Sequence, residues 1–263
     1  MFPEIHLFGK HIPMYMIFSL IGIFVMAIYL CKKAKKLNID DNDVIITMLF
    51  SAIGVLVGGH ILYGIVNWET IVFVFNNLKI IKNFSDFVNV VFYIFGGSVF
   101  YGGLLGGLLA GFIYLKKSKK DVCLMANFLA LGIPLFHFFG RLACFFEGCC
   151  YGTECQIGFV YHHSLIETAN GVIRFPIQLV EACLNLVLFF VLIKIYNYEK
   201  YKNHILQIYI LCYSVIRFTD EFWRGDLHRG LYFGLSTSQY ISMVLFFIAI
   251  LSLLREKKLK LKR

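Results

Sequence analysis

Long apolar segments alternate along this chain with short polar segments, most of them basic. About seven apolar segments have the length that crosses a bilayer as a helix. They lie near residues 13–31, 44–66, 97–115, 122–146, 175–196, 205–223 and 238–254. We therefore predict an all-α polytopic membrane protein with about seven transmembrane helices.

Basic clusters predict how these helices are oriented. They occur at Lys32–Lys36, Lys116–Lys120, Lys194–Lys202 and Arg255–Arg263, after alternate predicted spans. All four clusters therefore fall on one side of the membrane. Because short cytoplasmic segments carry an excess of Lys and Arg, we expect the N-terminus outside and the C-terminus in the cytoplasm.

The segments on the other side differ in character. Residues 83–95 are apolar but short, so we expect them to lie along the interface or to re-enter the membrane. Residues 147–174 have little apolar periodicity and predict a small ordered external loop. The N-terminus lacks a positive start and a cleavage site, so we expect 14–31 to be a retained span. With no linker or composition break, residues 1–263 are predicted to form one domain.

Composition supports the membrane assignment. The 263 residues are 59% hydrophobic and only 16% charged, which excludes an ordinary soluble domain. A net charge of +9 would suggest a nucleic-acid partner for a soluble protein. Here the positive charge lies in the short loops and the tail that set topology, so no nucleic-acid partner is expected.

A charged cluster ends the sixth apolar segment. Arg217, Glu221 and Arg224 share a helix face at their spacing, with Tyr213 and Asp220 beside them. A charge at bilayer depth costs at least about 2.5–3.5 kcal/mol on insertion scales, so such clusters are usually functional. Two cations that flank a carboxylate suit an anionic lipid head group.

Two more helices are predicted to direct polar side chains toward the same outer half of the membrane. In the fourth segment they are His137, Arg141 and Cys144, and in the fifth Gln178, Glu181 and Asn185. The alternative is that Arg and Glu pair across helices only to fix packing. That alternative explains one pair well but three groups at one depth poorly. For His137 alone, a hydrogen bond to a neighbouring carbonyl is an equal alternative.

Glycines gather at the start of the third segment. They allow close helix packing, or Gly102 and Gly103 let backbone N–H groups approach an anion at a helix N-terminus. Both interpretations remain open at this stage.

The chain has eight cysteines. Cys149 and Cys155 lie in the external segment, where a disulfide could close a short loop. Zinc is a weaker alternative, because no ordered Cys/His ligand spacing is present. Cys144 or Cys149 beside a cation could also be a reactive thiol.

Several motifs together resemble one family. They are GRLACFFEGCCYG at 140–152, FPIQLVE at 175–181, IRFTDEFWRGD at 216–226, GGSVFYGGL at 96–104 and STSQYIS at 236–242. This combination resembles prolipoprotein diacylglyceryl transferase over nearly the whole chain. The resemblance implies an enzyme that moves a diacylglyceryl group from phosphatidylglycerol to the lipobox cysteine thiol of a prolipoprotein. Glycerol phosphate leaves. It also implies a bacterial cell-membrane location, membrane lipids and a lipobox signal peptide as partners, and no cofactor or metal.

The resemblance also implies site residues. Arg141 matches the arginine of the family signature, and Arg217 with Glu221 matches its second arginine–glutamate pair. Tyr15 and Tyr213 fall near two tyrosines of the family. Three positions depart from its pattern: Tyr101 replaces a histidine, Cys144 an asparagine, and Cys149 an acidic residue, with an acid instead at Glu147.

From these residues we predict a division of roles. An arginine binds phosphate bidentately, so Arg141 and Arg217 are assigned to the lipid phosphate. Glu221, with Tyr101 or His137, is expected to orient or deprotonate the acceptor. The remaining candidates are predicted to bind substrate: Tyr15, Gly102, Gly103, Cys144, Glu147, Gln178, Glu181, Tyr213 and Arg224.

Two other functions stay open. The departures at Tyr101 and Cys144 favour a sibling enzyme that uses phosphatidylglycerol with another acceptor, such as a cell-surface glycan or lipid. A lipid transporter or scaffold without chemistry is the other alternative, although the repeated halves typical of transporters are not evident.

Overall fold

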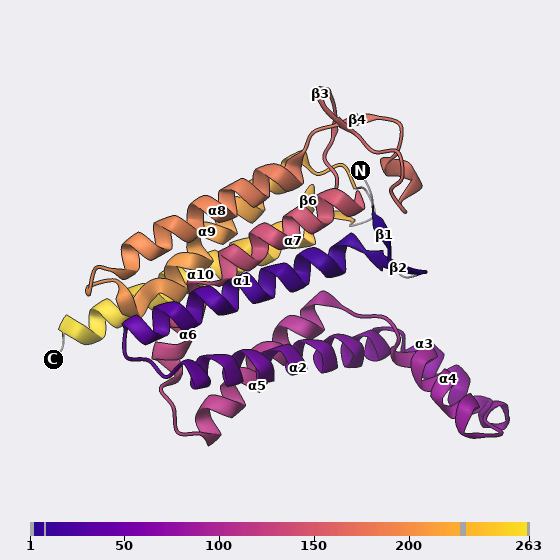
Figure 1. Cartoon of the computed structure of the whole chain (residues 1–263), viewed down its shortest axis with the longest axis horizontal. Helices are drawn as coiled ribbons and strands as arrows, with labels where there is room; N and C mark the ends of the chain where they lie inside the picture. Colours follow the sequence, from indigo (N-terminus) through magenta and orange to yellow (C-terminus); the bar gives the residue numbers. More distant parts are fainter. Residues whose placement is uncertain (1–2, 8, 227–229, 262–263) are drawn as a thin grey trace. The chain divides into compact units, whose positions relative to one another are not determined.

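The computed structural model describes residues 3–7, 9–226 and 230–261, and helices dominate them. The helices are α1 Met14–Lys36, α2 Asp41–Val66, α3 Trp68–Asn76, α4 Phe84–Phe95, α5 Phe100–Lys117, α6 Val122–Ala130, α7 Ile133–Glu147, α8 Ile177–Tyr196, α9 Ile205–Asp220 and α10 Thr237–Leu261, with short 3-10 turns η1 Leu78–Ile80, η2 Glu167–Ala169, η3 Lys202–His204 and η4 Glu221–Trp223. Figure 1 shows the chain from indigo at its start to yellow at its end.

In the part of the chain that the structure describes, three short antiparallel strand pairs accompany the helices of the predicted all-α fold. They pair β1 Glu4–Leu7 with β2 Lys10–Pro13, β3 Glu154–Val160 with β4 Ile173–Arg174, and β5 Leu231–Tyr232 with β6 Leu235–Ser236. Apart from β3 with its seven residues, these strands have only two to four residues, which is at or below the shortest run in which alternation can be recognised. The hairpin β3–β4 lies within the segment 147–174, which is ordered, as the sequence predicts.

The chain divides into two compact units. Unit 1 contains residues 1–33 and 126–263, and unit 2 contains residues 34–125. Each unit has its own packed helices, and the single domain expected from the sequence stays a prediction.

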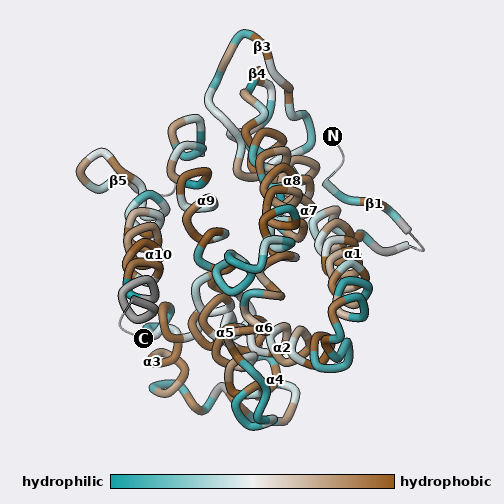
Figure 2. The backbone as a smooth tube through the Cα atoms, turned by 90° about the vertical axis from the view of Figure 1, so that its left-hand side faces the viewer, coloured by the Kyte–Doolittle hydropathy of each residue, from teal (hydrophilic) through white to brown (hydrophobic). Residues whose placement is uncertain are grey.

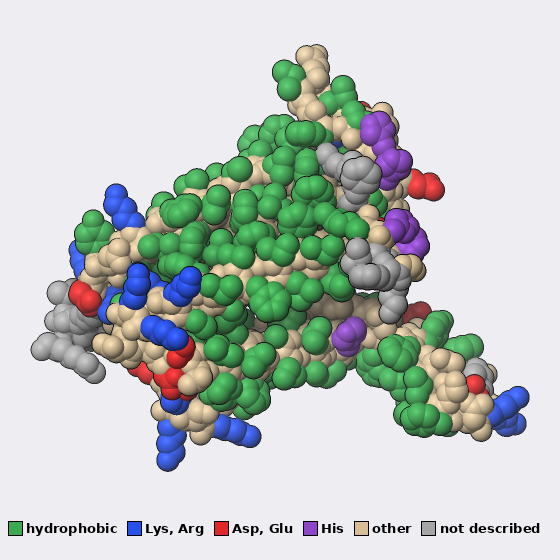
Figure 3. Space-filling model, in the orientation of Figure 1, with side chains coloured by type: hydrophobic (Ala, Val, Ile, Leu, Met, Phe, Trp, Pro, Cys, Tyr) green, Lys and Arg blue, Asp and Glu red, His purple; other side chains and the backbone are tan. Residues whose placement is uncertain are grey.

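In unit 1, helices α1, α7, α8, α9 and α10 run side by side, and α7 packs on α8, α8 on α9 and α9 on α10. The hairpin β3–β4 lies at one end of this bundle and the C-terminus at the other (Figure 1). Lys33 and Lys202 both lie over the Tyr196 ring, each 5.7 Å from its centroid. Both lysines therefore lie at the end of the bundle opposite the hairpin β3–β4. Most of the helical tube in Figure 2 is brown, the colour of hydrophobic residues. Hydrophobic side chains, drawn green, cover most of the bundle surface that Figure 3 shows.

The helices meet the criteria for membrane spans only in part. Helices α1, α2, α8 and α10 are each long and apolar enough to cross a bilayer. Two bent pairs, α4 with α5 at 98° and α6 with α7 at 42°, bring the number to six if each counts as one span. Helix α9 has 16 residues and is shorter than a typical span. These helices fit a polytopic membrane protein, whereas the number seven and the orientation stay predictions.

Unit 2 is built on close contact between α2 and α5. A Cβ atom at Gly54 would overlap the carbonyl oxygen of Gly106, and one at Gly58 would overlap that of Gly102. The same overlap arises on α5, because a Cβ at Gly102 or Gly106 would overlap a carbonyl oxygen of α2. Glycines four residues apart on each helix therefore let the two backbones touch. The packing interpretation of this glycine cluster is the one that the structure supports.

We expect Gly106→Ala to destabilise the protein by about 1–3 kcal/mol, because overpacking forces two backbones apart. Gly140→Ala is the matched control, since a Cβ at that helical position meets nothing within 4 Å. Alanine is also favoured over glycine in a helix by about 1 kcal/mol. Thermal unfolding in detergent, followed by tryptophan fluorescence, should show a lower midpoint for the first variant only. Equal midpoints for both variants would contradict the packing argument.

Candidate functional site

Two arginines of unit 1 form buried ion pairs with glutamates. Arg141 on α7 places Nη2 2.8 Å from Glu181 Oε1 on α8. Arg217 on α9 places Nη2 2.9 Å from Glu221 Oε2 in the following turn. The two glutamate side chains are only 2% and 5% exposed. Each predicted phosphate-binding arginine is therefore held by a carboxylate.

Arg217 keeps unused donor capacity. Its Nη2 also donates to Ser238 Oγ on α10 at 3.2 Å. Its Nη1 is buried and has no hydrogen-bond partner among the residues that the structure describes. A buried guanidinium donor without an acceptor is costly in a finished site. This atom can therefore donate to an acceptor from outside the described residues.

His137 and Tyr213 join α7 to α9 close to these pairs. Their ring centroids are 4.7 Å apart, and Tyr209 OH lies 3.5 Å from His137 Nδ1. Tyr213 also lies within electrostatic range of Arg141. The structure thus brings together polar groups of α7, α8 and α9, as the sequence predicts from their shared depth.

Sequence reasoning placed Asp220 beside this cluster and missed Ser238. Asp220 is 3% exposed, and its Oδ2 has no hydrogen-bond partner in the described part of the chain. Ser238, the partner of Arg217, lies at the start of α10. The motif STSQYIS contains Ser238, so a signal was present, but nothing in the sequence connects it to Arg217.

Arg224 is engaged differently from the other two arginines. Its Nε and Nη2 bind Asp226 Oδ1 and Oδ2 at 3.0 and 2.7 Å, and its side chain is 4% exposed. Both oxygens of one carboxylate therefore occupy the bidentate face that a phosphate would need. Its predicted role in substrate binding stays a prediction.

Gln178 organises the chain after α7. Its Nε2 donates to Cys149 O at 2.8 Å and to Tyr161 OH at 2.9 Å. Burial raises the pKa of Tyr161 to about 12, so the phenol remains neutral near pH 7 and can accept this bond. Gln178 is 1% exposed. Its observed contacts hold the loop, and substrate binding by this residue stays a prediction.

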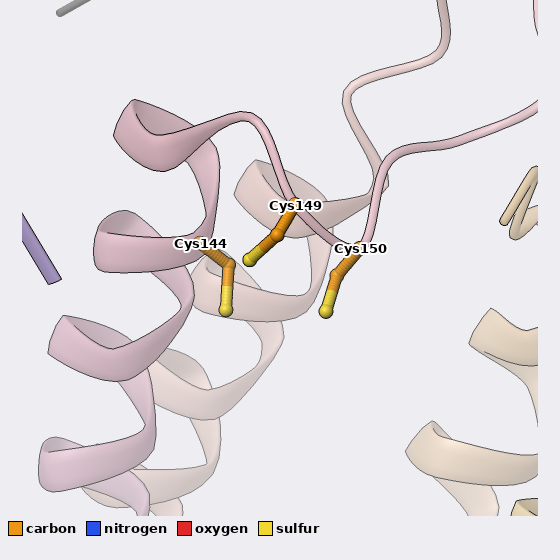
Figure 4. Close-up of side chains that lie close together, drawn as sticks. All are labelled: Cys144, Cys149 and Cys150. Carbon is orange, nitrogen blue, oxygen red and sulfur yellow. The ribbon is translucent and has the colours of Figure 1, made fainter. Parts of the chain in front are cut away.

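Three cysteines converge beside Arg141. The Sγ atoms of Cys144, Cys149 and Cys150 all lie within 4.8 Å of one another (Figure 4). Tyr15 of α1 lies within electrostatic range of these thiols and of Arg141. Glu147 Oε2 accepts a long contact from Cys149 Sγ at 3.9 Å. The predicted residues Tyr15, Cys144 and Glu147 thus belong to one neighbourhood.

The proposed Cys149–Cys155 disulfide is not formed. Cys149 and Cys155 are not joined to each other, and both side chains are thiols. Cys155 Sγ instead donates to Ile157 O at 3.1 Å, while Cys149 turns toward Cys144. The short loop is held by backbone and side-chain hydrogen bonds, so the disulfide interpretation is wrong for this structure.

Tyr101, Gly102 and Gly103 belong to unit 2. Gly103 donates its N–H to Val99 O at 3.1 Å and packs against Val55 of α2, while Gly102 packs against Gly58. Tyr101 is 38% exposed and its ring contacts Phe100. A role for these three residues at the lipid site stays a prediction.

Apolar, membrane-length helices around a buried cluster of arginine–carboxylate pairs define a helical membrane protein with an ionic site. The sequence model of the prolipoprotein diacylglyceryl transferase family matches residues 4–255. The chain belongs to this family, and the resemblance found in its motifs is confirmed.

Individual relatives agree with this assignment. The chain is 31% identical over 246 residues to the phosphatidylglycerol–prolipoprotein diacylglyceryl transferase of Clostridium tetani, which covers 93% of each chain. It is also 31% identical over 239 residues to the phosphatidylglycerol–prolipoprotein diacylglyceryl transferase 2 of Clostridium perfringens. That match covers 90% of this chain and 88% of the relative. A relative from Campylobacter hominis with the same transferase name is 27% identical over 273 residues, covering 97% and 92%.

Proposed function

We propose that this protein transfers the diacylglyceryl group of phosphatidylglycerol to the lipobox cysteine of prolipoproteins. Family membership supports the reaction, and the curated relatives carry its name. The observation within the chain that carries the proposal is the buried Arg217, whose Nη1 lacks an acceptor among the described residues. A lipid phosphate oxygen is an acceptor of the right charge for that atom.

Arg141 and Arg217 bind the phosphate in this proposal. Glu181 and Glu221 fix the two guanidinium groups before the lipid arrives, at 2.8 and 2.9 Å. Donors that are positioned in advance stabilise developing charge without reorganisation during the reaction. The departing phosphate monoester gains negative charge as its bond to glycerol carbon breaks, so both arginines act most strongly in the transition state.

The reaction balances as a substitution at carbon. The lipobox thiol loses its proton, and the sulfur attacks the terminal glyceryl carbon that carries the phosphate. A C–S bond forms, the C–O bond breaks, and glycerol phosphate leaves with the bonding electrons. In this proposal His137 accepts the thiol proton, and its position one helical turn from Arg141 and against Tyr213 supports that role. The arginines favour the thiolate through their positive charge.

The location follows from the same proposal. We place the enzyme in a bacterial plasma membrane as a multi-pass protein of seven spans, with its N-terminus outside and C-terminus in the cytoplasm. In unit 1, Lys33 and Lys202 lie together at one end of the bundle, which supports a basic, cytoplasmic end. In unit 2, Lys120 pairs with Asp43 at 2.7 Å, and this hydrogen bond raises the pKa of Lys120.

Topology can be tested by labelling with an impermeant maleimide in a background without native cysteines. A cysteine at position 162 should be labelled from outside intact cells, because residues 147–174 are external in this proposal. A cysteine at position 118 should be labelled only after the cells are opened, because the basic segment is cytoplasmic. External labelling at 118 but not at 162 would overturn the orientation.

A reconstituted assay tests the activity. Purified protein is supplied with phosphatidylglycerol labelled in its diacylglyceryl part and with a peptide that contains a lipobox cysteine. Label in the peptide together with equimolar glycerol phosphate supports the proposal, and a lipobox Cys→Ser peptide is the control. Release of glycerol phosphate without peptide labelling would instead favour another acceptor, consistent with the departures at Tyr101 and Cys144. If neither a labelled peptide nor glycerol phosphate is formed, the result counts against an enzyme of this class.

A further inference from the structure

The three clustered thiols form a set of soft donors to which the transfer reaction as written above assigns no bond-making or bond-breaking step. Cys144 projects from α7, while Cys149 and Cys150 follow the end of that helix (Figure 4). Their sulfur atoms are mutually within 4.8 Å, and all three are free. Cys144 is 8% exposed, while the other two are half-buried. The cluster is therefore sheltered on one side and open on the other.

The backbone forces this convergence. Gly148 ends α7 with a left-handed φ of 78°, and the N–H groups of Gly148 and Cys149 both donate to Cys144 O, at 3.0 and 3.1 Å. This helix cap folds Cys149 back over Cys144. Cys150 then has a φ of 58°, which is unusual for a residue with a side chain. Strained backbone of this kind is retained mainly where the surrounding structure fixes it.

Contacts on both sides of the turn hold the thiols in place. Gln178 donates to Cys149 O at 2.8 Å, so α8 fixes the first half of the turn. Gly225 N donates to Tyr151 O at 2.9 Å, and Gly152 forms a bridge with Arg224, so the segment after α9 fixes the second half. The three sulfurs are thus positioned before any ligand binds, which lowers the cost of binding one.

Three convergent thiols match the ligand preferences of a thiophilic metal ion. In a tetrahedral Zn²⁺ site with Zn–S bonds of about 2.3 Å, two sulfur ligands lie about 3.8 Å apart. The sulfur atoms of this cluster lie within 4.8 Å of one another, so each distance needs to shorten by at most about 1 Å. Small side-chain rotations would close the set. The Glu147 carboxylate, 3.9 Å from Cys149 Sγ, is within reach of a fourth position. Carboxylate oxygen is a known zinc ligand beside sulfur.

The surrounding charge also fits. Three thiolates, the Glu147 carboxylate and one divalent cation carry a net charge of −2. Arg141 and Arg224 lie within electrostatic range of Cys150, so two cations flank the cluster. They offset the excess negative charge of a metal–thiolate centre and favour loss of the thiol protons on metal binding.

We propose that Cys144, Cys149 and Cys150 form a binding site for a thiophilic d¹⁰ metal ion such as Zn²⁺, with Glu147 as a fourth ligand. The site clips the turn after α7 to the helix that carries Arg141. A disulfide would use only two of the three thiols and would require an oxidant. A metal ion uses all three, and for that reason the observed convergence favours it. The proposal does not depend on the transfer reaction.

The test is metal binding by the purified full-length protein, reduced and then freed of reductant without exposure to air. Elemental analysis after Zn²⁺ loading should give one ion per chain, and Co²⁺ should produce the intense thiolate-to-cobalt charge-transfer absorption. Single changes Cys144→Ser, Cys149→Ser and Cys150→Ser should each weaken binding more than about 100-fold, since loss of outer partners alone costs 10–100-fold. Cys155→Ser is the matched control, because its thiol lies in the same segment but bonds Ile157 O.

A second readout separates metal binding from misfolding. A chelator should lower the thermal midpoint of the loaded wild-type and Cys155→Ser proteins, because a ligand that binds only the folded state stabilises it. It should leave the midpoints of the cluster variants unchanged. Wild-type protein that retains no Zn²⁺ and gives no cobalt–thiolate absorption would overturn the proposal. Unaltered binding in all three cluster variants, or a disulfide among these cysteines under the same air-free conditions, would also overturn it.

Discussion

Replacing either Arg141 or Arg217 by lysine is expected to slow diacylglyceryl transfer by about ten- to a hundredfold. Lysine keeps the charge but loses the planar set of donors that binds carboxylate and phosphate together. Arg217 uses Nη2 for Glu221 and Ser238, and its Nη1 remains for the lipid. A hydrogen bond to a charged group contributes about 1.5–3 kcal/mol, and each 1.36 kcal/mol of barrier is tenfold in rate.

Arg174→Lys is the matched control for this prediction. Arg174, like the other two, is a buried arginine, and it lies at the end of the 147–174 segment. Its guanidinium, however, donates to the carbonyls of Thr168, Ala169 and Gly152 and stacks on the Tyr151 ring. Its loss should lower the thermal midpoint and leave the rate per folded molecule unchanged. Initial rates with labelled phosphatidylglycerol measure the effect. Wild-type turnover in both the Arg141 and the Arg217 variants would refute the phosphate assignment.

The second large effect is expected at the proton-transfer residues. His137→Gln and Tyr101→Phe should lower kcat with little change in KM for the lipid, because they remove proton transfer rather than binding. Glu221→Gln should instead raise KM and disturb geometry, since it leaves Arg217 without its carboxylate at 2.9 Å. In this proposal the Glu221 carboxylate orients Arg217 and does not take the thiol proton.

Rates measured from pH 6 to pH 9 distinguish these roles. Tyr114→Phe and His162→Gln serve as controls, because Tyr114 stacks on Phe50 in unit 2 and His162 is an exposed residue of the external segment. Both controls should follow the wild-type profile. If His137→Gln and Tyr101→Phe both keep full turnover across that range, the proposed proton route is wrong and Glu221 becomes the leading base.

Helices were predictable from the sequence because their signal is long and local. Each of the seven predicted spans is mostly helical, although 122–146 divides into α6 and α7 with a bend of 42°, and 205–223 forms α9 and η4. The short apolar segment 83–95 forms α4, capped by Asn83, whose side chain accepts from Asp86 N at 2.9 Å. Its bend of 98° from α5 agrees with a segment that does not continue the span.

The candidate site was predictable only as a set of residues at one depth. The pair Arg217–Glu221 follows from spacing on one helix, and the structure contains it. The pair Arg141–Glu181 joins two helices, and helix spacing cannot specify which partner an arginine takes. The cysteine cluster was missed for a similar reason. It depends on the left-handed turn at Gly148 and Cys150, which a search for regular ligand spacing does not detect.

The contrast between these two ion pairs has a consequence for how the chain enters the membrane during synthesis. Arg217 has its carboxylate one turn away on the same segment, so the charge can be neutralised as soon as that helix forms. This local pairing suits α9, which is short for a span. The Arg141 charge can be neutralised only after Glu181, 40 residues later on α8, has been synthesised. We therefore expect α7 and α8 to leave the translocation channel together, as a helical pair, because α7 alone would expose an uncompensated guanidinium to lipid.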